Sequence, residues 1–595
     1  MILGLKVFSS LLAVSPAVAQ IIDSTGSVVT SPNETVLSGN GSSVLNPAAL
    51  TATITINLQQ YWDLLVGPVA SATINSTVAA TPIPTSELIP PPPLYYSSFP
   101  TGAQAPLVSK NESWKFPSGF FWGVSSAAYQ IEGAMQAEGR GPSNWDIYTH
   151  RSTEITAGND TGDVGCNEYY LYKQDIARIA ALGVPYYSFS ISWSRIFPFG
   201  KGPVNELGLQ HYDDLINTCL EYGVQPMVTL FHWDIPLFLQ NEYGGWLSEE
   251  IVADFVAYAR VVFARYGDRV TNWFTLNEPL VFCDEYPYPK NYFTAVDIPD
   301  AEQKFFCGHH ALLAHAQAYR LGKAMGLKGI IAFKNNGGYK IPLTNSTDDA
   351  LAVQRAWDFN EGWYANPVYI DGDYPTHLKD YVATLGLAFS EEQKALIRGT
   401  SDIFAHDAYT SSFYMAPAEG GGVAACVANA SHPLFPGCFN TTNVNGDGWN
   451  IGAASDPYTP WLNSATDWVP AFLRYIQDTW PCEGGIAVSE FGWAEPFEHL
   501  KTLRQDILYD PGRIAYYHNY LEAVLVAIAD GVNVVGCLAW SIMDNLEWTS
   551  GFYPKFGVQY VNFTTYERSY KASFFEYVNM FKVYAEDPVV PVFVS

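Results

Sequence analysis

Short apolar runs alternate with stretches of helical periodicity from Trp114 almost to the end of the chain. Each run stops abruptly at polar residues, Pro or Gly, the pattern of a buried strand that leads into a loop. Eight runs predict strands: Phe121–Ala127, Pro185–Ile191, Gln225–Phe231, Asn272–Leu276, Gly329–Phe333, Asp402–Ala405, Gly485–Val488 and Val534–Ala539. Between them, segments such as Lys173–Gly183 have apolar residues at helical spacing and a terminal Gly.

This repetition of strand and helix predicts an α/β fold built from βα units. Eight units across residues 114–590 predict a (β/α)8 TIM barrel with enlarged βα loops. In such a barrel the loops that follow the strands form the active face, so polar residues at strand ends are the first candidates for chemistry.

The chain before the barrel differs from it in amino-acid composition. Residues 1–19 are typical of a signal peptide, with Lys6, an apolar stretch and a small-residue end before Gln20. Residues 20–113 are rich in Ser, Thr and Pro, and we expect a glycosylated, largely irregular extension with a stiff polyproline element at 90–93. Within it, Leu50–Leu65 has strand-like alternation, which indicates a small ordered piece.

Several features favour a secreted glycoprotein, extracellular or associated with the cell wall. Glycosylation sequons begin at Asn33, Asn40, Asn75, Asn111, Asn159, Asn345, Asn429, Asn440 and Asn562. Disulfides are then expected, and Cys283–Cys307 and Cys426–Cys438, which bracket loops, are the predicted pairs. We expect Cys166, Cys219 and Cys537, in regular segments, to be buried thiols.

Composition and charge exclude other classes. A net charge of −28 and a pI near 4.6 argue against nucleic-acid binding. We find no apolar stretch long enough for a membrane span after the signal and no Cys/His spacing of a metal site. Aromatic residues make up 15% of the chain, which suits both a large core and a cleft lined by rings.

Two glutamates stand at ends of predicted strands. Glu278 follows Asn272–Leu276, and Glu490 follows Gly485–Val488. A carboxylic acid that donates a proton and a carboxylate that attacks carbon together break a glycosidic bond. The fourth and seventh strands would bring these two side chains to one rim of the barrel.

Four motifs recur in a fixed order: Phe120–Gly133 (FFWGVSSAAYQIEG), Phe231–Asp234 (FHWD), Thr275–Pro279 (TLNEP) and Ala539–Trp548 (AWSIMDNLEW). With them the chain resembles glycoside hydrolase family 1, the β-glucosidase-like retaining enzymes, over about residues 114–580. The resemblance implies that Glu278 is the general acid/base and Glu490 the nucleophile that forms a covalent glycosyl-enzyme. The family usually has Thr-Glu-Asn-Gly where this chain has Ser489-Glu490-Phe491-Gly492.

The same resemblance implies a set of sugar-binding residues and no cofactor. Gln130, His232 and Glu547 would hold the hydroxyls far from the scissile bond, and Asn277 the 2-hydroxyl. Trp540 would offer its face to the sugar ring, beside Trp548. Tyr409 is placed like the tyrosine that donates a hydrogen bond to the nucleophile.

Two departures from the family pattern concern the charge near Glu490. Ser188 stands where the family has an arginine that pairs with the nucleophile, and Arg195 matches a different family arginine. Asp407 stands where the family has Asn. With a cation lost and an acid added, we expect the acid limb of the pH–rate profile to lie at higher pH than in arginine-bearing relatives.

The sequence therefore predicts a secreted retaining β-glycosidase, an O-glycosyl hydrolase acting as a β-glucosidase on terminal β-D-glucosyl residues. Cellobiose-like or aryl β-glucosides are the expected substrates, with a part in cellulose degradation. Cleavage of galactosides or fucosides and transglycosylation stay open, because the hydroxyl-binding residues accept several epimers. The alternative is a carbohydrate-binding or cell-wall glycoprotein that uses the barrel as a lectin, which the loss of the arginine would favour.

Overall fold

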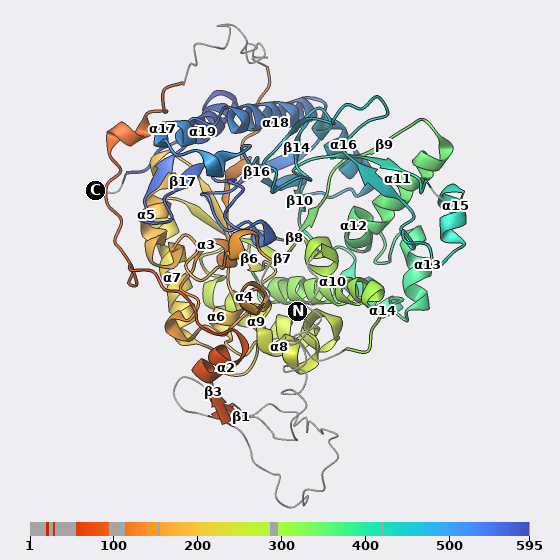
Figure 1. Ribbon diagram of the computed structural model, residues 1–595, viewed down its shortest axis with the longest axis horizontal. Helices are drawn as coiled ribbons and strands as arrows, with labels where there is room; N and C mark the ends of the chain where they lie inside the picture. Colours follow the sequence, from red (N-terminus) through yellow and green to blue (C-terminus); the bar gives the residue numbers. More distant parts are fainter. Residues whose placement is uncertain are drawn as a thin grey trace, which may run out of the picture.

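The computed structural model describes residues 20–22, 28–29, 55–93, 113–151, 155–285, 296–418 and 421–593. Its centre is a closed barrel of eight parallel strands, which confirms the predicted fold class (Figure 1). Around the barrel the strand order is β10-β15-β16-β4-β5-β6-β7-β8. These strands are β4 Phe121–Ser125, β5 Tyr186–Ser190, β6 Gln225–Phe231, β7 Asn272–Asn277, β8 Ile330–Asn336, β10 Phe404–Asp407, β15 Ile486–Phe491 and β16 Val534–Trp540. All eight predicted strands are present, with bounds that differ by a few residues.

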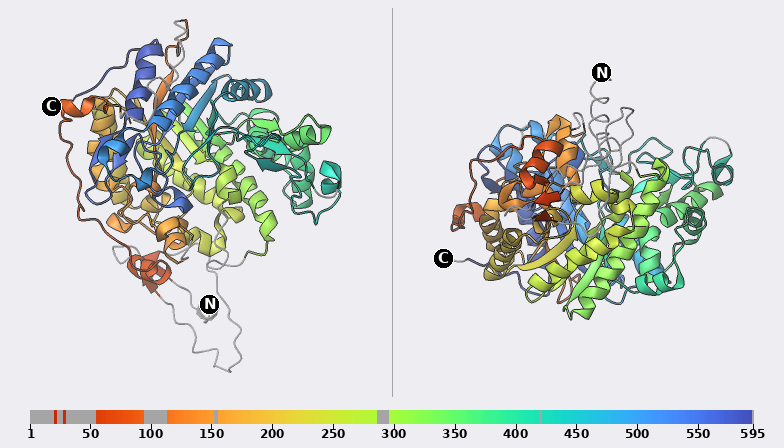
Figure 2. Two further views of the ribbon diagram at one scale, coloured as in Figure 1. Left: turned by 45° about the horizontal axis from the view of Figure 1, so that its top comes forward. Right: turned by 90° about the horizontal axis from the view of Figure 1, so that it is seen from below.

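Helices surround the barrel, and others lie in the enlarged loops beside it (Figures 1 and 2). They are α3 Ala128–Ile131, α4 Asn144–Arg151, α5 Glu168–Ala181, α6 Trp193–Ile196, α7 Glu206–Glu221, α8 Leu237–Tyr243, α9 Glu250–Tyr266, α10 Asp300–Ala324, α11 Thr347–Phe359, α12 Glu361–Tyr369, α13 Thr376–Thr384, α14 Glu391–Ile397, α15 Gly422–Val427, α16 Val469–Thr479, α17 Arg504–Leu508, α18 Pro511–Ala529 and α19 Ala572–Tyr584. In the part of the chain that the structure describes, no helix is both long and apolar enough to cross a bilayer.

The enlarged loops carry small sheets of their own. β9 Lys340–Pro342, β11 Ser412–Met415 and β12 Asn440–Thr442 form one, β13 Ala453–Ala454 pairs with β14 Asn463–Ser464, and β17 Gln559–Val561 pairs with β18 Arg568–Tyr570. Disulfides join Cys283 to Cys307 and Cys426 to Cys438, as predicted. Cys166, Cys219 and Cys537 are buried thiols, also as predicted.

An apolar layer fills the lower part of the barrel interior. It consists of Phe121, Met227, Phe274, Ala332, Ile403, Ala405, Ala487 and Leu538, all buried and packed together. Because side chains alternate along a strand, residues two positions further on point into the same interior, nearer the strands' carboxyl ends. On β8 that residue is Lys334, and on β10 it is Asp407. The apolar layer thus forms a floor beneath Lys334 and Asp407.

Residues 57–93, here called the strap, lie along the outside of the barrel next to α5 (Figures 1 and 2). The strap begins with α2, Leu58–Leu65, which follows the short strand β3, Thr55–Asn57. In the described part of Leu50–Leu65, the small ordered piece that the alternation indicated consists of β3 and α2. Trp62 of α2 is 1% exposed, and its Nε1 donates a 2.9 Å hydrogen bond to the Arg140 carbonyl.

After α2 the strap is mostly irregular, apart from a 3-10 turn at Thr85–Leu88. It is held by hydrogen bonds to the loop that precedes α5 and to α5 itself. Asp163 accepts from the Ala70 amide, Asn167 donates to the Ile74 carbonyl, and Gln174 accepts from the Thr81 amide, at 2.7, 3.0 and 2.7 Å. Each pair is separated by 93 residues, so the strap and the chain through α5 run in the same direction in a fixed register.

Candidate functional site

Glu278 lies at the point where β7 gives way to a loop. Its amide donates to the Lys334 carbonyl at 3.0 Å, so the parallel ladder with β8 continues to this residue. Its φ is +45°, in the left-handed region that a glutamate rarely adopts. The side chain is 8% exposed. A non-glycine residue held in this region is commonly found at functional sites.

Glu490 is the last residue but one of β15 and is buried. Each carboxylate oxygen has a partner. The Tyr409 hydroxyl donates to Oε2 at 3.0 Å, the contact expected for this tyrosine. The Lys334 ammonium donates to Oε1 at 2.8 Å. Tyrosine and lysine together hold the carboxylate in one orientation.

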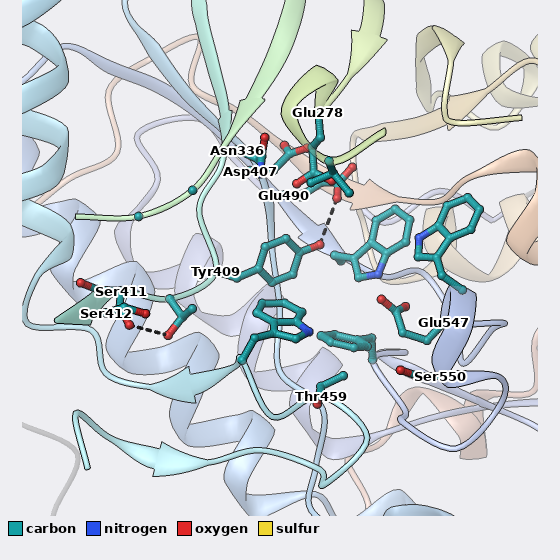
Figure 3. Close-up of a pocket in the computed structure, with 18 of the residues that line it drawn as sticks. Glu278, Asn336, Asp407, Tyr409, Ser411, Ser412, Thr459, Glu490, Glu547 and Ser550 are labelled. Atoms are coloured by element: carbon teal, nitrogen blue, oxygen red, sulfur yellow. Dashed lines mark hydrogen bonds between the residues drawn. The ribbon is translucent and has the colours of Figure 1, made fainter. Parts of the chain in front are cut away.

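A cavity of about 330 Å³ opens above these groups at the carboxyl ends of the strands. Figure 3 shows Glu278, Asp407 and Glu490 grouped on one side of it and Glu547 on another. The predicted site residues that line it are His232, Glu278, Tyr409, Glu490, Trp540, Glu547 and Trp548. Further lining residues include Trp233, Asn336, Asp407, Trp461 and Phe556. The eighth and ninth predicted residues, Gln130 and Asn277, reach the site through Glu547 and His232.

These contacts connect the polar side chains of the site. The Gln130 amide donates to the Leu546 carbonyl at 2.7 Å and approaches Glu547 Oε2 at 3.4 Å. Asn277 Nδ2 lies 3.3 Å from His232 Nε2. Gln130 Oε1, His232 Nδ1 and Asn277 Oδ1 are buried and have no hydrogen-bond partner among the described residues. Because buried polar atoms are normally paired, these three are suited to hold ligand hydroxyls.

Protonation states follow from burial. Burial and the nearby Lys334 ammonium lower the pKa of His232 well below its usual range, so the imidazole is neutral. A neutral ring that accepts from Asn277 through Nε2 carries its proton on Nδ1 and can donate it to a ligand. Burial, together with the charge of Glu490, raises the pKa of Glu547 to about 8. Glu547 is therefore protonated at neutral pH and can both donate and accept.

Indole rings shape the wall of the cavity. Trp540 is the last residue of β16, and its ring lies 5.7 Å from the His232 ring. The Trp548 ring packs 4.4 Å from Trp233 and 4.6 Å from Trp145. These aromatic faces are buried on one side and meet the cavity on the other, which suits the flat C–H faces of a sugar.

Lys334 is the functional residue that sequence reasoning missed. We expected no cation beside Glu490, because Ser188 replaces the family arginine; that expectation is wrong. Arg195 does lie elsewhere, paired with Glu132 at 2.7 Å. The available signal was a lysine directly after the apolar run Ile330–Phe333, two positions beyond Ala332 and therefore on the same, inward face of the strand.

Asp407 also differs from its expected role. Burial and the neighbouring Glu490 raise the pKa of Asp407 well above its usual range, against the opposing effects of Lys334 and of a hydrogen bond from Ser489. The neutral acid is favoured, so Asp407 does not add the negative charge that its sequence position suggested.

The described residues contain no group of three or more His, Cys, Asp or Glu side chains arranged to hold a metal ion. The chemistry of the site is that of its own side chains: a carboxyl group at Glu278, an oriented carboxylate at Glu490, and a set of hydrogen-bonding groups that face the same space. This arrangement suits acid–base and nucleophilic catalysis on a polyhydroxylated ligand.

Known proteins with similar sequences are β-glucosidases. β-Glucosidase 12 of Oryza sativa subsp. japonica is 36% identical over 488 residues, which cover 79% of this chain and 92% of the relative. β-Glucosidase 1B of Phanerodontia chrysosporium is 36% identical over 479 residues, which cover 77% of this chain and 84% of the relative.

Solved structures agree. The β-glucosidase of Trichoderma harzianum superposes with a TM-score of 0.73 at 33% identity, over 81% of this chain and all of that one. A rice β-glucosidase variant, solved in a covalent complex with glucose, superposes with a TM-score of 0.72 at 30% identity. The match covers 80% of this chain and 100% of that one. The family model described as glycosyl hydrolase family 1 matches residues 112–584. This chain belongs to glycosyl hydrolase family 1.

Proposed function

We propose that this protein is a retaining β-glucosidase that releases terminal β-D-glucosyl residues through a covalent glycosyl-enzyme. The observation that carries the proposal is the meeting of Glu278 and Glu490 in one cavity, with both oxygens of Glu490 held by Lys334 and Tyr409. A lectin would have no use for such an oriented carboxylate. The related proteins reported above are named as β-glucosidases, and they lend the lectin alternative no support.

In the first step, the Glu490 carboxylate attacks the anomeric carbon while the bond to the aglycone oxygen breaks. Glu278 donates its proton to that oxygen, so the aglycone leaves as a neutral alcohol. The products of this step are a glycosyl ester on Glu490 and a carboxylate on Glu278. A bond forms and a bond breaks at the same carbon, and its configuration is inverted.

In the second step, the Glu278 carboxylate takes a proton from a water molecule as that water attacks the anomeric carbon. Glu490 departs as a carboxylate, which restores both residues and inverts the carbon again. The two inversions together give retention. If the hydroxyl of a second sugar takes the place of water, the same step is transglycosylation.

Binding of the glucosyl unit is assigned to the buried polar atoms beside the carboxylates. Gln130, His232 and Glu547 would hold the hydroxyls remote from the scissile bond, and Asn277 the 2-hydroxyl. A hydrogen bond to that hydroxyl strengthens as positive charge develops on the ring, so Asn277 favours the transition state over the bound substrate. Trp540 would stack on the ring.

Hydrolysis of 4-nitrophenyl β-glucoside between about pH 3 and 8 tests the proposal, with Glu490→Gln and Glu278→Gln as variants. Both should lose nearly all activity. Incubation with a 2-deoxy-2-fluoro glucoside that bears a good leaving group should add one fluoroglucosyl unit to a Glu490 peptide, as seen by mass spectrometry. Galactoside, fucoside and cellobiose substrates measured alongside define the glycone and decide whether cellobiose, the substrate that links the enzyme to cellulose breakdown, is cleaved.

The absence of wild-type activity on all of these substrates, together with binding of glucose or cellobiose, would favour the lectin alternative. Retention of activity in Glu490→Gln would show that the nucleophile is assigned to the wrong residue. Adding azide to Glu278→Gln offers an internal check, because a small anion can attack the glycosyl ester without a general base and should restore turnover of an activated substrate.

We further propose that the protein is secreted as a glycoprotein and acts outside the cell or in the wall. The signal-like residues 1–19 support this, as do the two disulfides, which persist in oxidising compartments. Among the described sequons, Asn75, Asn159, Asn345, Asn429 and Asn440 are exposed. Analysis of the protein from culture medium should find an N-terminus near Gln20 and a mass that falls on treatment with an N-glycosidase. An unprocessed N-terminus and no glycan would contradict this proposal.

A further inference from the structure

Lys334 reaches the active site from inside the barrel, directly above its apolar floor. It lies on β8, two residues beyond Ala332 of the apolar floor, so its side chain enters the barrel interior. β8 pairs with β10, where Ala405 is the register partner of Lys334, and β10 pairs with β15, where Asp407 opposes Glu490. From the floor, the four-carbon side chain passes the Phe274 ring, whose centroid is 5.2 Å from Nζ, and ends at Glu490 Oε1.

The pair is buried on both sides. The Lys334 side chain is 2% exposed and that of Glu490 is 4% exposed. A lysine is almost never buried to this extent without a partner, because loss of its hydration must be offset by a nearby opposite charge. Among the described residues that line the cavity there is no lysine or arginine, so the ammonium beneath them is the positive charge closest to the carboxylates.

Several acidic groups surround this ammonium. Glu490 contacts it directly, Asp407 lies on the intervening strand β10, and Glu278 follows β7 on the other side. Burial lowers the pKa of Lys334, but the Glu490 carboxylate in direct contact outweighs that effect and holds the pKa of Lys334 above its usual range. Tyr409 and Glu547 complete the titratable set around Glu490, and burial raises the pKa of both, so both are neutral.

We propose that Lys334 is the positioning residue of the nucleophile: its ammonium offsets the negative charge of the buried Glu490 carboxylate and fixes Oε1 while the other oxygen is held by Tyr409. The inference rests on the proposed role of Glu490. It assigns the charge that faces the nucleophile to the fifth strand of the barrel, β8, rather than to the second, β5, where Ser188 stands.

The catalytic cycle shows what this charge does. Glu490 is an anion before attack, a neutral ester in the intermediate, and an anion again after water attacks. The ammonium stabilises both anionic states, so it improves Glu490 as a leaving group in the second step. Loss of the ammonium should therefore narrow the pH range of activity on its acid side. It should also slow hydrolysis of the glycosyl-enzyme.

The test compares Lys334→Met, Lys334→Arg and Lys340→Met. Lys340 is a matched control, because it is equally buried and paired, with Glu361 at 2.6 Å, but does not contact Glu490. The readout is the pH dependence of kcat/KM for 4-nitrophenyl β-glucoside. Removal of a charge at this distance should move the acid limb of Lys334→Met upward by about 1–3 pH units, whereas Lys334→Arg should keep it near the wild-type position.

Lys340→Met should lose thermal stability without any movement of the acid limb. If Lys334→Met does not fold, Lys334→Gln takes its place, because it retains a hydrogen-bond donor near Oε1 without the charge. A folded, uncharged Lys334 variant whose acid limb coincides with that of the wild type would overturn the inference.

Failure of the proposed function gives a different result from failure of this inference. If Glu490 is not the nucleophile, Glu490→Gln retains activity and no fluoroglucosyl label appears on it. If Glu490 is the nucleophile but Lys334 has no positioning role, Glu490→Gln is inactive and the label appears, while the acid limb is the same in wild type and Lys334→Met. A movement of the limb in Lys340→Met equal to that in Lys334→Met would also overturn the inference, because it would show a general effect of lost stability.

Discussion

Asp407 and Glu490 are register partners on adjacent strands of the barrel, and their carboxyl groups have different hydrogen-bond partners. Glu490 faces an ammonium at 2.8 Å, whereas Asp407 accepts a 2.7 Å hydrogen bond from the Ser489 hydroxyl. Burial beside the Glu490 charge favours the neutral form of Asp407. Ionisation of both buried acids would cost free energy, because two neighbouring carboxylates repel each other. The Lys334 ammonium at Glu490 and the proton kept by Asp407 avoid that cost.

Replacement of Asp407 by asparagine should leave the acid limb of the pH–rate profile almost unchanged, because the amide resembles the protonated acid. Its effect on stability should depend on pH. Since the folded protein holds the Asp407 proton at pH values where the unfolded chain releases it, the wild type loses stability as pH rises above the ordinary aspartate pKa, by up to about 1.4 kcal/mol per pH unit. The amide does not titrate and so removes that loss, which means that the melting temperature of D407N relative to wild type should rise from pH 4 to pH 7. A constant difference would mean that Asp407 is ionised in the folded state.

Glu547→Gln should abolish the change of KM with pH that the titration of Glu547 causes in the wild type. With a pKa of about 8, Glu547 changes from the neutral to the charged form within an accessible range. The wild-type KM should therefore change as pH passes through about 8, whereas the KM of the Gln variant should not. The KM values of the two proteins should differ less below pH 7 than at pH 9. Parallel KM profiles for the two proteins would contradict the neutral state assigned to Glu547.

Tyr409→Phe removes the hydroxyl that binds Glu490 Oε2. A hydrogen bond to a charged group contributes about 1.5–3 kcal/mol, so kcat/KM should fall by about 10- to 100-fold. Tyr577→Phe is the control, because the buried Tyr577 hydroxyl donates to the Gly123 carbonyl rather than to Glu490. That variant should lose stability and keep kcat/KM. Equal losses of kcat/KM in both variants would refute a specific role for Tyr409.

Trp62→Ala should release the strap without disabling the active site. Truncation of a buried indole costs about 3–5 kcal/mol, and Tyr61 is the other buried residue of α2. We expect faster amide exchange and protease cleavage within residues 57–93, while kcat/KM changes less than twofold because no strap residue lines the cavity. Leu64→Ala is the control, since Leu64 is 55% exposed on the same helix. If protection is unchanged in Trp62→Ala, the indole does not anchor the strap.

Most of the barrel could be predicted because each inner strand is short, apolar and ended by a polar residue or Gly. The predicted strand Asp402–Ala405 became Phe404–Asp407, since the apolar pattern does not reveal how far a strand continues into polar residues of the active face. The start of α2 was missed for a local reason. Asn57 accepts from the Gln60 amide, and Gln60 accepts in turn from the Asn57 amide. This capping box can be recognised in the sequence.

Much of the candidate site was also within reach of the sequence, because ordered motifs carry Glu278, His232 and Glu547. The cation at Glu490 was not, for a geometric reason. The interior of a closed barrel gathers side chains from strands that are far apart in sequence, so a charge missing from β5 can be supplied by β8. A search for a replacement near Ser188 along the chain cannot find Lys334, which lies three strands further on.

The register of the strap has a consequence for the order in which the protein folds during synthesis. The partners of Trp62, Ala70, Ile74 and Thr81 described above lie between Arg140 and Gln174. They are therefore made soon after the strap and long before β15 and β16, the strands that close the barrel. The strap can therefore dock on the first βα unit while the barrel is still open.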